Sequence, residues 1–396
     1  MKILFLTYDV PYPLNSGGKI RAYHLLKSLA QRNQLTLFSY YRSEDQKKYL
    51  GELEKYCSQI FLFKRRKAWS WQNFCLTFLM PFAAAGYYSS QLEKELKKEL
   101  AGGKYDLVHF ESFYPALYLP TVKKLGLRTV LGNENLEYLV YRRYANSQPR
   151  WLRSILSLEV ERLWRFEEKL WRLADLNLQA SKSDALEVEK ITGKPCLVVA
   201  NGVNFEKYQT VDYHQNRKAI IYVGNLVYPA NTDAVGFFLE KIYPKIRKRV
   251  EGVKFILVSG YEPRWLKRYI NDPSIEYFKD TMTPAAQLLL QADVLVAPMR
   301  IASGTNIKIL EAMAAGLPVV TTSIGAEGLK VTNQGNIIIA DRPEEMADLT
   351  AKLLTNQPLR EKIGRKARQT IEDNYDWSKT TQGLDLAYRK LINGKT

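Results

Sequence analysis

Cysteine, histidine and long hydrophobic runs are all scarce in this sequence. Its 396 residues include only three His and three Cys, and Cys57, Cys75 and Cys196 lie far apart without a histidine at metal-ligand spacing. Neither a disulfide framework nor a zinc site is expected, and a reducing compartment is the default. No stretch reaches the ~20 apolar residues that a membrane-spanning helix needs. The first apolar run is broken at Asp9 and Pro11, which favours a β-strand over a signal peptide. We expect a protein that is soluble or rests on a membrane surface.

Acidic residues are outnumbered by basic ones. Lys and Arg total 58 and Asp and Glu 41, which gives a net charge of +17. Residues 1–205 hold 31 basic and 20 acidic side chains, so the first half carries +11 of this excess. Such a charge favours an anionic partner: nucleic acid, anionic lipid or a phosphorylated substrate. Nucleic acid is the weakest of the three, because no helix-turn-helix, zinc or RNA-recognition signature accompanies the charge.

Short apolar runs alternate with helix-period segments along the whole chain, which is too long for one compact core. The runs are continuous rather than alternating in polarity, as is typical of parallel strands covered by helices on both faces. A polar segment at 206–218 predicts a linker, and hence two doubly wound α/β domains; 378–392 predicts a separate amphipathic helix. The predicted strands are 3–7, 35–40, 107–110, 129–131, 176–180, 197–200, 219–223, 254–259, 275–278, 294–297, 319–321 and 336–340.

Gly17 and Gly18 lie between the first predicted strand and the helix that follows it. Adjacent glycines at such a turn allow backbone N–H groups to approach a ligand closely, and a helix N-terminus favours negative charge. The loop is not a dinucleotide-binding fingerprint, because no G-x-G-x-x-G is present. A glycine turn that only reverses the chain is an equally good interpretation of this motif alone.

A second loop follows the fourth predicted strand of the second domain. Ser303, Gly304 and Thr305 predict a compact nest of N–H donors in front of a helix. Lys308 and Glu311 are three residues apart and therefore share one face of that helix. There a cation could meet a phosphate and a carboxylate could meet sugar hydroxyls. As a bare spacing, the pair is more often a solvated ion pair.

The stretch 297–320, with Ser323–Leu329 after it, resembles the donor-site signature of the family 4 glycosyltransferases. Further landmarks are similar in family order, so the resemblance covers nearly the whole chain. These landmarks are Gly17-Gly18 with Arg21, 201–204 and 223–225. The resemblance implies a GT-B fold, in which two Rossmann-like domains face a cleft and the C-terminal helix crosses back onto the first. The first domain, 1–205 with 377–396, would then bind the acceptor, and the second, 206–376, the nucleotide-sugar.

The resemblance also implies a reaction. Family members transfer a sugar from a nucleotide-diphosphate sugar with retention and without an obligatory metal or other cofactor, and this sequence contains no Asp-x-Asp. Glu311 matches the family carboxylate that hydrogen-bonds the ribose, and Gly17 and Gly18 match the loop whose backbone faces the diphosphate. Lys308 and Glu311 are the predicted catalytic residues. The predicted donor-binding residues are Gly17, Gly18, Asn225, Arg300, Ser303, Gly304 and Thr305.

The donor site departs from the family pattern in its charges. Ser303 stands where the first of two family glutamates is usual, and Asn225 and, approximately, Asn231 stand where an Arg and a Lys are usual. Lys308 and Arg300 are therefore the predicted source of positive charge for the diphosphate.

The acceptor side departs as well. Phe110 stands at the place of a family His, and its neighbour His109 is expected to point into the core. The predicted acceptor-binding residues are Glu111, Glu134 and Glu137. For the last two, a capped helix start beside surface arginines is the slightly favoured interpretation.

Two stretches combine cations with tryptophan. Four consecutive basic residues at 64–67 precede Trp69, Trp71 and Phe74, which favours an anionic membrane surface. The stretch 151–172 has a similar composition, but a leucine repeat at seven-residue spacing makes an ordinary helix core equally plausible there.

Together these observations predict a retaining glycosyltransferase of cell-surface polysaccharide synthesis, with a saccharide or lipid-linked acceptor. It would be cytoplasmic and peripheral at the inner face of the membrane. One alternative is a catalytically silent GT-B protein that binds a sugar nucleotide or a partner enzyme. The other is a sugar-nucleotide epimerase, which shares the fold but normally has more His and acidic residues in its cleft.

Overall fold

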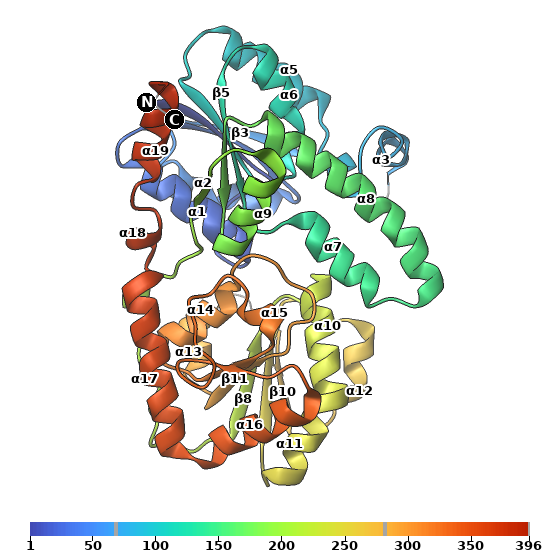
Figure 1. Ribbon diagram of the computed structural model, residues 1–396, viewed down its shortest axis with the longest axis vertical. Coiled ribbons are helices and arrows are strands. Elements are labelled where there is room, and N and C mark those ends of the chain that lie inside the picture. Colours follow the sequence, from blue (N-terminus) through green and yellow to red (C-terminus); the bar gives the residue numbers. More distant parts are fainter. Residues whose placement is uncertain (67–69, 280–282, 395–396) are drawn as a thin grey trace. The chain divides into compact units, whose positions relative to one another are not determined.

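The computed structural model describes residues 1–66, 70–279 and 283–394 (Figure 1). The chain forms two compact units: unit 1 is Met1–Ala200 with Thr381–Thr396, and unit 2 is Asn201–Thr380. The division lies five residues before the predicted one, because Val203 pairs with Asp376 in a β-bridge and Asn201 bonds to Thr305. Lys67 and Trp69 of the basic stretch lie outside the described residues.

Unit 1 contains a seven-stranded parallel sheet in the order β3-β2-β1-β4-β5-β6-β7. The order reverses between β1 and β4, and in such doubly wound sheets ligands bind beyond the carboxyl ends of the strands near this point. The strands are β1 (Lys2–Thr7), β2 (Gln34–Tyr41), β3 (Gln59–Lys64), β4 (Leu107–Glu111), β5 (Arg128–Asn133), β6 (Leu176–Gln179) and β7 (Cys196–Val198).

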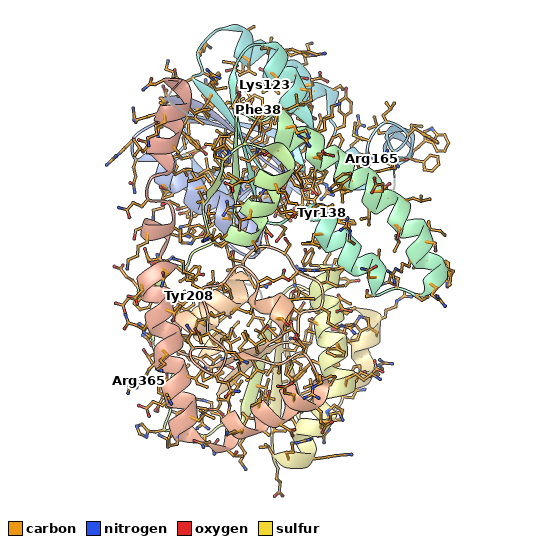
Figure 2. The ribbon with its side chains drawn as sticks, viewed as in Figure 1. Phe38, Lys123, Tyr138, Arg165, Tyr208 and Arg365 are labelled. Carbon is orange, nitrogen blue, oxygen red and sulfur yellow. The ribbon has the colours of Figure 1, made fainter. Side chains whose placement is uncertain are left out.

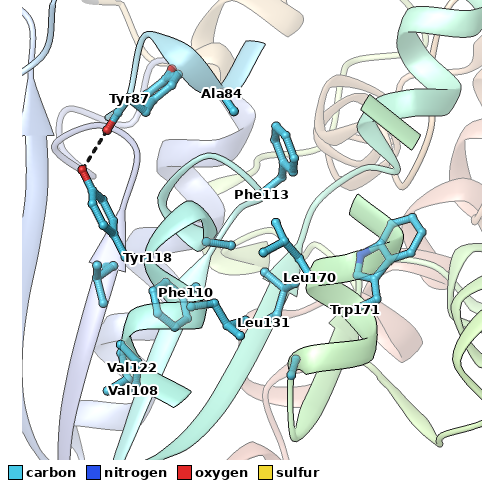
Figure 3. Packing of buried hydrophobic residues seen from close by; sticks show 14 of the residues in the cluster. Ala84, Tyr87, Val108, Phe110, Phe113, Tyr118, Val122, Leu131, Leu170 and Trp171 are labelled. Atoms are coloured by element: carbon cyan, nitrogen blue, oxygen red, sulfur yellow. Dashed lines mark hydrogen bonds between the residues drawn. The ribbon is translucent and has the colours of Figure 1, made fainter. Parts of the chain in front are cut away.

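Helices cover both faces of this sheet and bury a separate core on each. Figure 3 shows part of one core, in which Phe110 and Leu131 of the sheet lie near Leu170 and Trp171 of α8. The helices of unit 1 are α1 (Gly17–Ala30), α2 (Leu50–Leu53), α3 (Trp71–Leu76), α4 (Phe82–Ala85), α5 (Ser90–Ala101), α6 (Leu119–Lys124), α7 (Glu137–Asn146), α8 (Arg150–Leu173), α9 (Lys182–Thr192) and α19 (Leu384–Ile392).

The last helix completes the second core of unit 1. Leu384, Tyr388 and Leu391 of α19 belong to the same buried cluster as Ile3 and Phe5 of β1. The single helix predicted over 378–392 is in fact two, α18 (Trp377–Thr380) in unit 2 and α19. Between them Gly383 has φ +91°, a left-handed conformation that interrupts the helix and that glycine adopts without steric cost.

Unit 2 repeats the same arrangement with six parallel strands in the order β10-β9-β8-β11-β12-β13. The strands are β8 (Ala219–Val223), β9 (Lys254–Val258), β10 (Ile275–Phe278), β11 (Val294–Ala297), β12 (Val319–Thr321) and β13 (Ile338–Ile339). The other helices are α10 (Pro229–Phe237), α11 (Tyr243–Arg249), α12 (Lys267–Ile270), α13 (Ala285–Leu289), α14 (Ile307–Ala314), α15 (Ser323–Ala326), α16 (Pro343–Thr355) and α17 (Gln357–Asn374).

The predicted α/β fold with two parallel sheets is confirmed, and each of the twelve predicted strands overlaps an observed one. The prediction missed β3, an edge strand whose side chains are mostly half-exposed and lie beside the charged segment. Within the described residues, no helix combines the length and apolar character needed to cross a bilayer.

Candidate functional site

The loop between β11 and α14 is fixed from both sides. Gly304 has φ +69°, which places this residue in the left-handed region and makes glycine the favoured residue. The Asn201 side chain donates to the Thr305 carbonyl at 3.1 Å, and Asn306 donates to the Gly325 carbonyl at 2.9 Å. Ser303 and Thr305 are both buried, and Thr305 Oγ1 has no hydrogen-bond partner within the described part of the chain.

Lys308, in the first turn of α14, points at neutral oxygens of β8 and α10. Its Nζ donates to Tyr222 Oη at 2.8 Å and to Asn231 Oδ1 at 2.5 Å, and lies 4.6 Å from the centre of the Tyr222 ring. Asn231 Nδ2 in turn donates to the Asn225 carbonyl at 2.9 Å. None of the ion pairs found among residues 1–66, 70–279 and 283–394 includes Lys308. Its ammonium is therefore held by neutral groups, and Glu311 lies near enough to act on its charge without forming a salt bridge.

Glu311 lies one turn further along α14. Its Oε1 accepts a hydrogen bond of 2.8 Å from Tyr208 Oη, which reaches it from the segment that leads into unit 2. Burial raises the pKa of Glu311 to about 7, against the opposing effects of Tyr208 and of nearby Lys308. Burial likewise lowers the pKa of Lys308 to about 7, while Glu311 opposes the shift. Both groups therefore titrate near neutral pH.

The structure separates the other two predicted donor residues of unit 2. Arg300 makes a two-pronged ion pair with Asp233 of α10, at 3.0 and 2.5 Å, and its guanidinium lies 4.3 Å from the centre of the Phe237 ring. Asn225 joins the Lys308 network through its carbonyl, while its side chain accepts from the Val227 N–H at 2.9 Å. Of the two predicted cations, Arg300 is paired with a carboxylate and Lys308 is bonded to neutral oxygens.

In unit 1, Gly17 and Gly18 open α1, as expected, and Gly18 is buried. A Cβ on Gly18 would lie 2.1 Å from Tyr8 Oη, so the tyrosine hydroxyl occupies the space that any other residue here would need. The group that closely approaches the start of α1 is therefore the Tyr8 side chain of the same unit.

Glu111, at the end of β4, belongs to a buried network. Its carboxylate accepts from Arg21 Nε at 2.8 Å and lies 2.7 Å from His109 Nε2, and Arg21 also donates to the Val199 carbonyl at 2.6 Å. Gly132 makes room for it, since a Cβ there would lie 2.4 Å from Glu111 Oε2. Burial opposes ionisation of Glu111, but Arg21 and His109 together hold its pKa below the usual value. Acceptor binding by Glu111 stays a prediction, for a carboxylate whose two oxygens already have protein partners.

His109 is fully buried, as expected, and stacks on the Phe5 ring with 4.2 Å between ring centres. Its Nδ1 is hydrogen-bonded to the hydroxyl of Tyr388 in α19. The histidine therefore links β4 to the C-terminal helix, a structural role.

Glu134 and Glu137 lie after β5 among tyrosines. Burial raises the pKa of each to about 7, and their mutual repulsion adds to the shift at Glu137. Tyr114 Oη donates to Glu137 at 3.4 Å, and its ring lies 5.6 Å from that of Tyr8. The predicted capped helix start is present too, because the buried Glu167 of α8 accepts from the first N–H groups of α7.

Sequence reasoning missed the tyrosines and amides of these sites. Tyr208 and Tyr222 fix Glu311 and Lys308, but their positions in the sequence carry no motif. Asn133 and Gln179 are register partners at the carboxyl ends of β5 and β6, and both are buried with no partner for either amide within the described residues. Both residues could have been found from the sequence, because each is a polar residue near the end of a predicted buried strand.

No group of three or more His, Cys, Asp or Glu side chains in the described part of the chain could hold a metal ion.

Part of the sequence is similar to known glycosyltransferases. Residues 217–356 match the family model of the glycosyl transferases group 1. The chain is 23% identical over 396 residues to a 44.6 kDa protein of the cps region of Klebsiella pneumoniae, covering 97% of this chain and 98% of that protein. It is 24% identical over 321 residues to the phosphatidyl-myo-inositol mannosyltransferase of Mycobacterium leprae, covering 77% and 78%.

Solved structures share the fold. The Anabaena protein Alr3699/HepE, in complex with UDP and glucose, superposes with a TM-score of 0.68 at 15% identity, covering 98% of this chain and 99% of that one. The resemblance inferred from the sequence is confirmed: the fold is GT-B, and the part of the chain that carries Lys308 and Glu311 matches the family model of the group 1 glycosyltransferases.

Proposed function

We propose that the protein transfers a hexose-type sugar from a nucleotide-diphosphate sugar, with retention and without a required metal, in cell-surface polysaccharide synthesis. The Klebsiella relative belongs to a cps region, and the Anabaena neighbour was solved with UDP and glucose, which supports both the pathway class and the donor class. The mannosyltransferase relative is named for a phosphatidyl lipid, which favours a lipid-linked acceptor over a free saccharide.

One observation carries this proposal: Lys308 is positioned by two neutral oxygens and has no ion-pair partner among the residues that the structure describes. Departure of the sugar builds negative charge on the diphosphate, and a fixed cation in a partly buried site stabilises that charge strongly. Lys308 would supply this charge, the N–H groups of Ser303–Thr305 would add to it, and Glu311 would accept hydrogen bonds from the ribose. A metal would then have no required part.

Acceptor binding is assigned to unit 1. Glu134 and Glu137 can accept hydrogen bonds from sugar hydroxyls, and Tyr8 and Tyr114 beside them offer rings on which a sugar can lie. The acceptor hydroxyl would attack on the face that the diphosphate leaves, with its proton passing to the departing phosphate. The reaction therefore needs no dedicated base in either unit.

The test is a panel of nucleoside diphosphates and nucleotide-sugars, with and without Mg²⁺ and EDTA. We expect one sugar nucleotide to raise the melting temperature without metal, because a ligand that binds the native state shifts unfolding by mass action. The shift should be lost in Glu311→Ala and kept in Lys352→Ala, a control at an exposed lysine of the same unit. Transfer or donor hydrolysis should accompany binding.

The silent-protein alternative draws support from the Arg300–Asp233 ion pair, which occupies a predicted donor cation. Donor binding without transfer or hydrolysis, over a range of lipid and saccharide acceptors, would favour it. Conversion of the donor sugar to its epimer would favour the epimerase.

We further propose that this enzyme works at the inner face of the cytoplasmic membrane, in contact with anionic lipid.

A further inference from the structure

One internal segment of unit 1 has no charged residue at all. Residues 68–92 contain no Asp, Glu, Lys or Arg, directly after the four cations of 64–67. Burial explains this gap in charge only at its end, where Ala84, Ala85 and Tyr87 are buried. Five large apolar side chains before them are between 42 and 80% exposed: Trp71, Phe74, Phe78, Leu79 and Phe82, which lie in α3, in the turn after it and at the start of α4.

These aromatic side chains form a continuous stripe. Trp71, Phe74 and Phe78 follow one another at helical spacing, and their rings are in contact, with 5.6 Å between the first two centres and 5.8 Å between the second two. Asn73 and Ser70 satisfy the start of the helix, so its fold does not depend on the exposed rings. The stripe is therefore presented to the surroundings by a defined backbone.

A second exposed stripe lies on the first turns of α8. Trp151, Ile155 and Leu158 recur at spacings of four and three, which places them on one face of the helix, and each is at least 60% exposed. The segment 150–158 contains Arg150 and Arg153 but no acidic residue. The structure thereby divides the second Trp-rich stretch, because further along α8 Leu163, Leu170 and Trp171 are core.

Hydrogen bonds join the two stripes. Arg162 of α8 donates to the carbonyls of Thr77 and Met80, and Glu159 accepts from the Phe82 N–H at 2.5 Å. Figure 2 shows Arg165 on α8 and the sticks of α3 nearby. We call the eight exposed side chains together the α3–α8 surface. They are Trp71, Phe74, Phe78, Leu79, Phe82, Trp151, Ile155 and Leu158.

We propose that the α3–α8 surface inserts into the interfacial layer of an anionic lipid bilayer. Large apolar patches on a soluble unit mark sites of contact, and aromatic rings flanked by cations suit the membrane interface. Four arginines lie within or just before the two stripes: Arg65, Arg66, Arg150 and Arg153. The acidic neighbour of Leu158, Glu159, is paired with Arg162 at 2.9 Å. A protein partner would need an apolar groove with an acidic rim, whereas an anionic bilayer supplies both features over any area. The proposal identifies the surface that attaches the protein to a membrane, and it rests on the proposed function only for the choice of membrane.

The test is flotation of the full chain with vesicles of phosphatidylcholine alone or mixed equally with phosphatidylglycerol, without donor or acceptor. We expect binding to the mixed vesicles. Phe78→Ser with Leu79→Ser, and separately Trp151→Ser with Leu158→Ser, should each weaken it at least about tenfold, since each pair removes two apolar side chains that the bilayer would bury. Arg150→Gln with Arg153→Gln should weaken binding to the mixed vesicles by about fivefold per arginine.

The matched control is Leu186→Ser with Leu386→Ser, which removes two leucines of similar exposure on α9 and α19 and should leave binding unchanged. All variants lie at exposed positions, and thermal unfolding checks that they fold. Absence of vesicle binding by the unaltered chain, or equal loss in the control, would overturn the proposal. So would a dimer in sedimentation that the α3–α8 variants dissociate. Because no substrate is present, failure here is separate from failure of the glycosyltransferase proposal.

Discussion

Each unit has a basic residue near a glutamate, but the two pairs differ in their contacts. In unit 1 Arg21 is bonded directly to Glu111, whereas in unit 2 Lys308 and Glu311 each bond to other residues. Arg21 and Glu111 are each no more than 3% exposed, and both carboxylate oxygens have protein partners. Among the described residues, Lys308 donates to two neutral oxygens and forms no salt bridge, and Glu311, one turn away, is held by a tyrosine hydroxyl. The charges of the first cluster are matched within the fold, whereas an ammonium without a direct carboxylate contact favours an anion from outside.

The largest effect expected from this comparison is on stability in unit 1. Arg21→Met leaves Glu111 buried without its cation, which should lower the free energy of unfolding by about 3–5 kcal/mol. Urea unfolding followed by fluorescence measures it. Removing both charges in Arg21→Met with Glu111→Leu should restore most of the loss, because a buried pair costs about as much to desolvate as it returns. An unchanged free energy of unfolding in Arg21→Met would contradict the idea that Arg21 neutralises Glu111.

Activity should respond most strongly in unit 2. Lys308→Ala should reduce turnover at least about 100-fold, the scale reported for loss of one preorganised charge-stabilising group. Its unfolding free energy should stay the same or rise, because the variant removes a partly buried ammonium that has no carboxylate partner. Rates within a few-fold of the original chain for both Lys308→Ala and Glu311→Ala would mean that the site lies elsewhere.

The two clusters should also differ in how ligand binding depends on pH. With the pKa of Lys308 lowered to about 7, the unfolded chain binds more protons than the native one above that pH, so its contribution to stability rises as pH rises. A bound diphosphate favours the ammonium and reverses this. Nucleoside diphosphate affinity should therefore fall above pH 7, by up to about tenfold per pH unit. Calorimetry in buffers of different ionisation enthalpy should detect proton uptake.

The control is Lys308→Arg, whose guanidinium stays charged throughout. Its binding should show no proton uptake above pH 7. Uptake of the same size in that variant would assign the proton to another group, with Glu311 first to be examined by Glu311→Gln.

The smallest effect concerns Tyr208, which positions Glu311. Tyr208→Phe removes a hydrogen bond that favours the carboxylate, worth about 1 kcal/mol, and should raise the pKa of Glu311 further. Relative to the unaltered chain at the same pH, donor affinity should be a few-fold lower at pH 7 and nearly equal at pH 8, where the carboxylate of the variant is ionised again. A loss of the same size at both pH values would indicate a packing role instead.

The fold could be predicted from the sequence because continuous apolar runs such as Leu107–Phe110 identify strands covered on both faces. Lys308 and Glu311 could be picked out because they share a helix face behind a small-residue loop. The edge strand β3 escaped because its burial is partial. The sequence also could not show which cation is free to bind a phosphate. Arg300 is paired with Asp233, whereas Lys308 is held by Tyr222 and Asn231, and only the folded chain brings these residues together.

The return of α19 to unit 1 has a consequence for synthesis. During translation, residues 1–200 leave the ribosome long before α19, and the hydroxyl that bonds His109 lies 279 residues further along. Until then the side of β1 that holds Ile3 and Phe5 lacks Leu384, Tyr388 and Leu391. Unit 1 must therefore wait, incompletely covered, while unit 2 is made. A prematurely terminated chain would expose this gap to chaperones and proteases, so only full-length molecules would complete both cores.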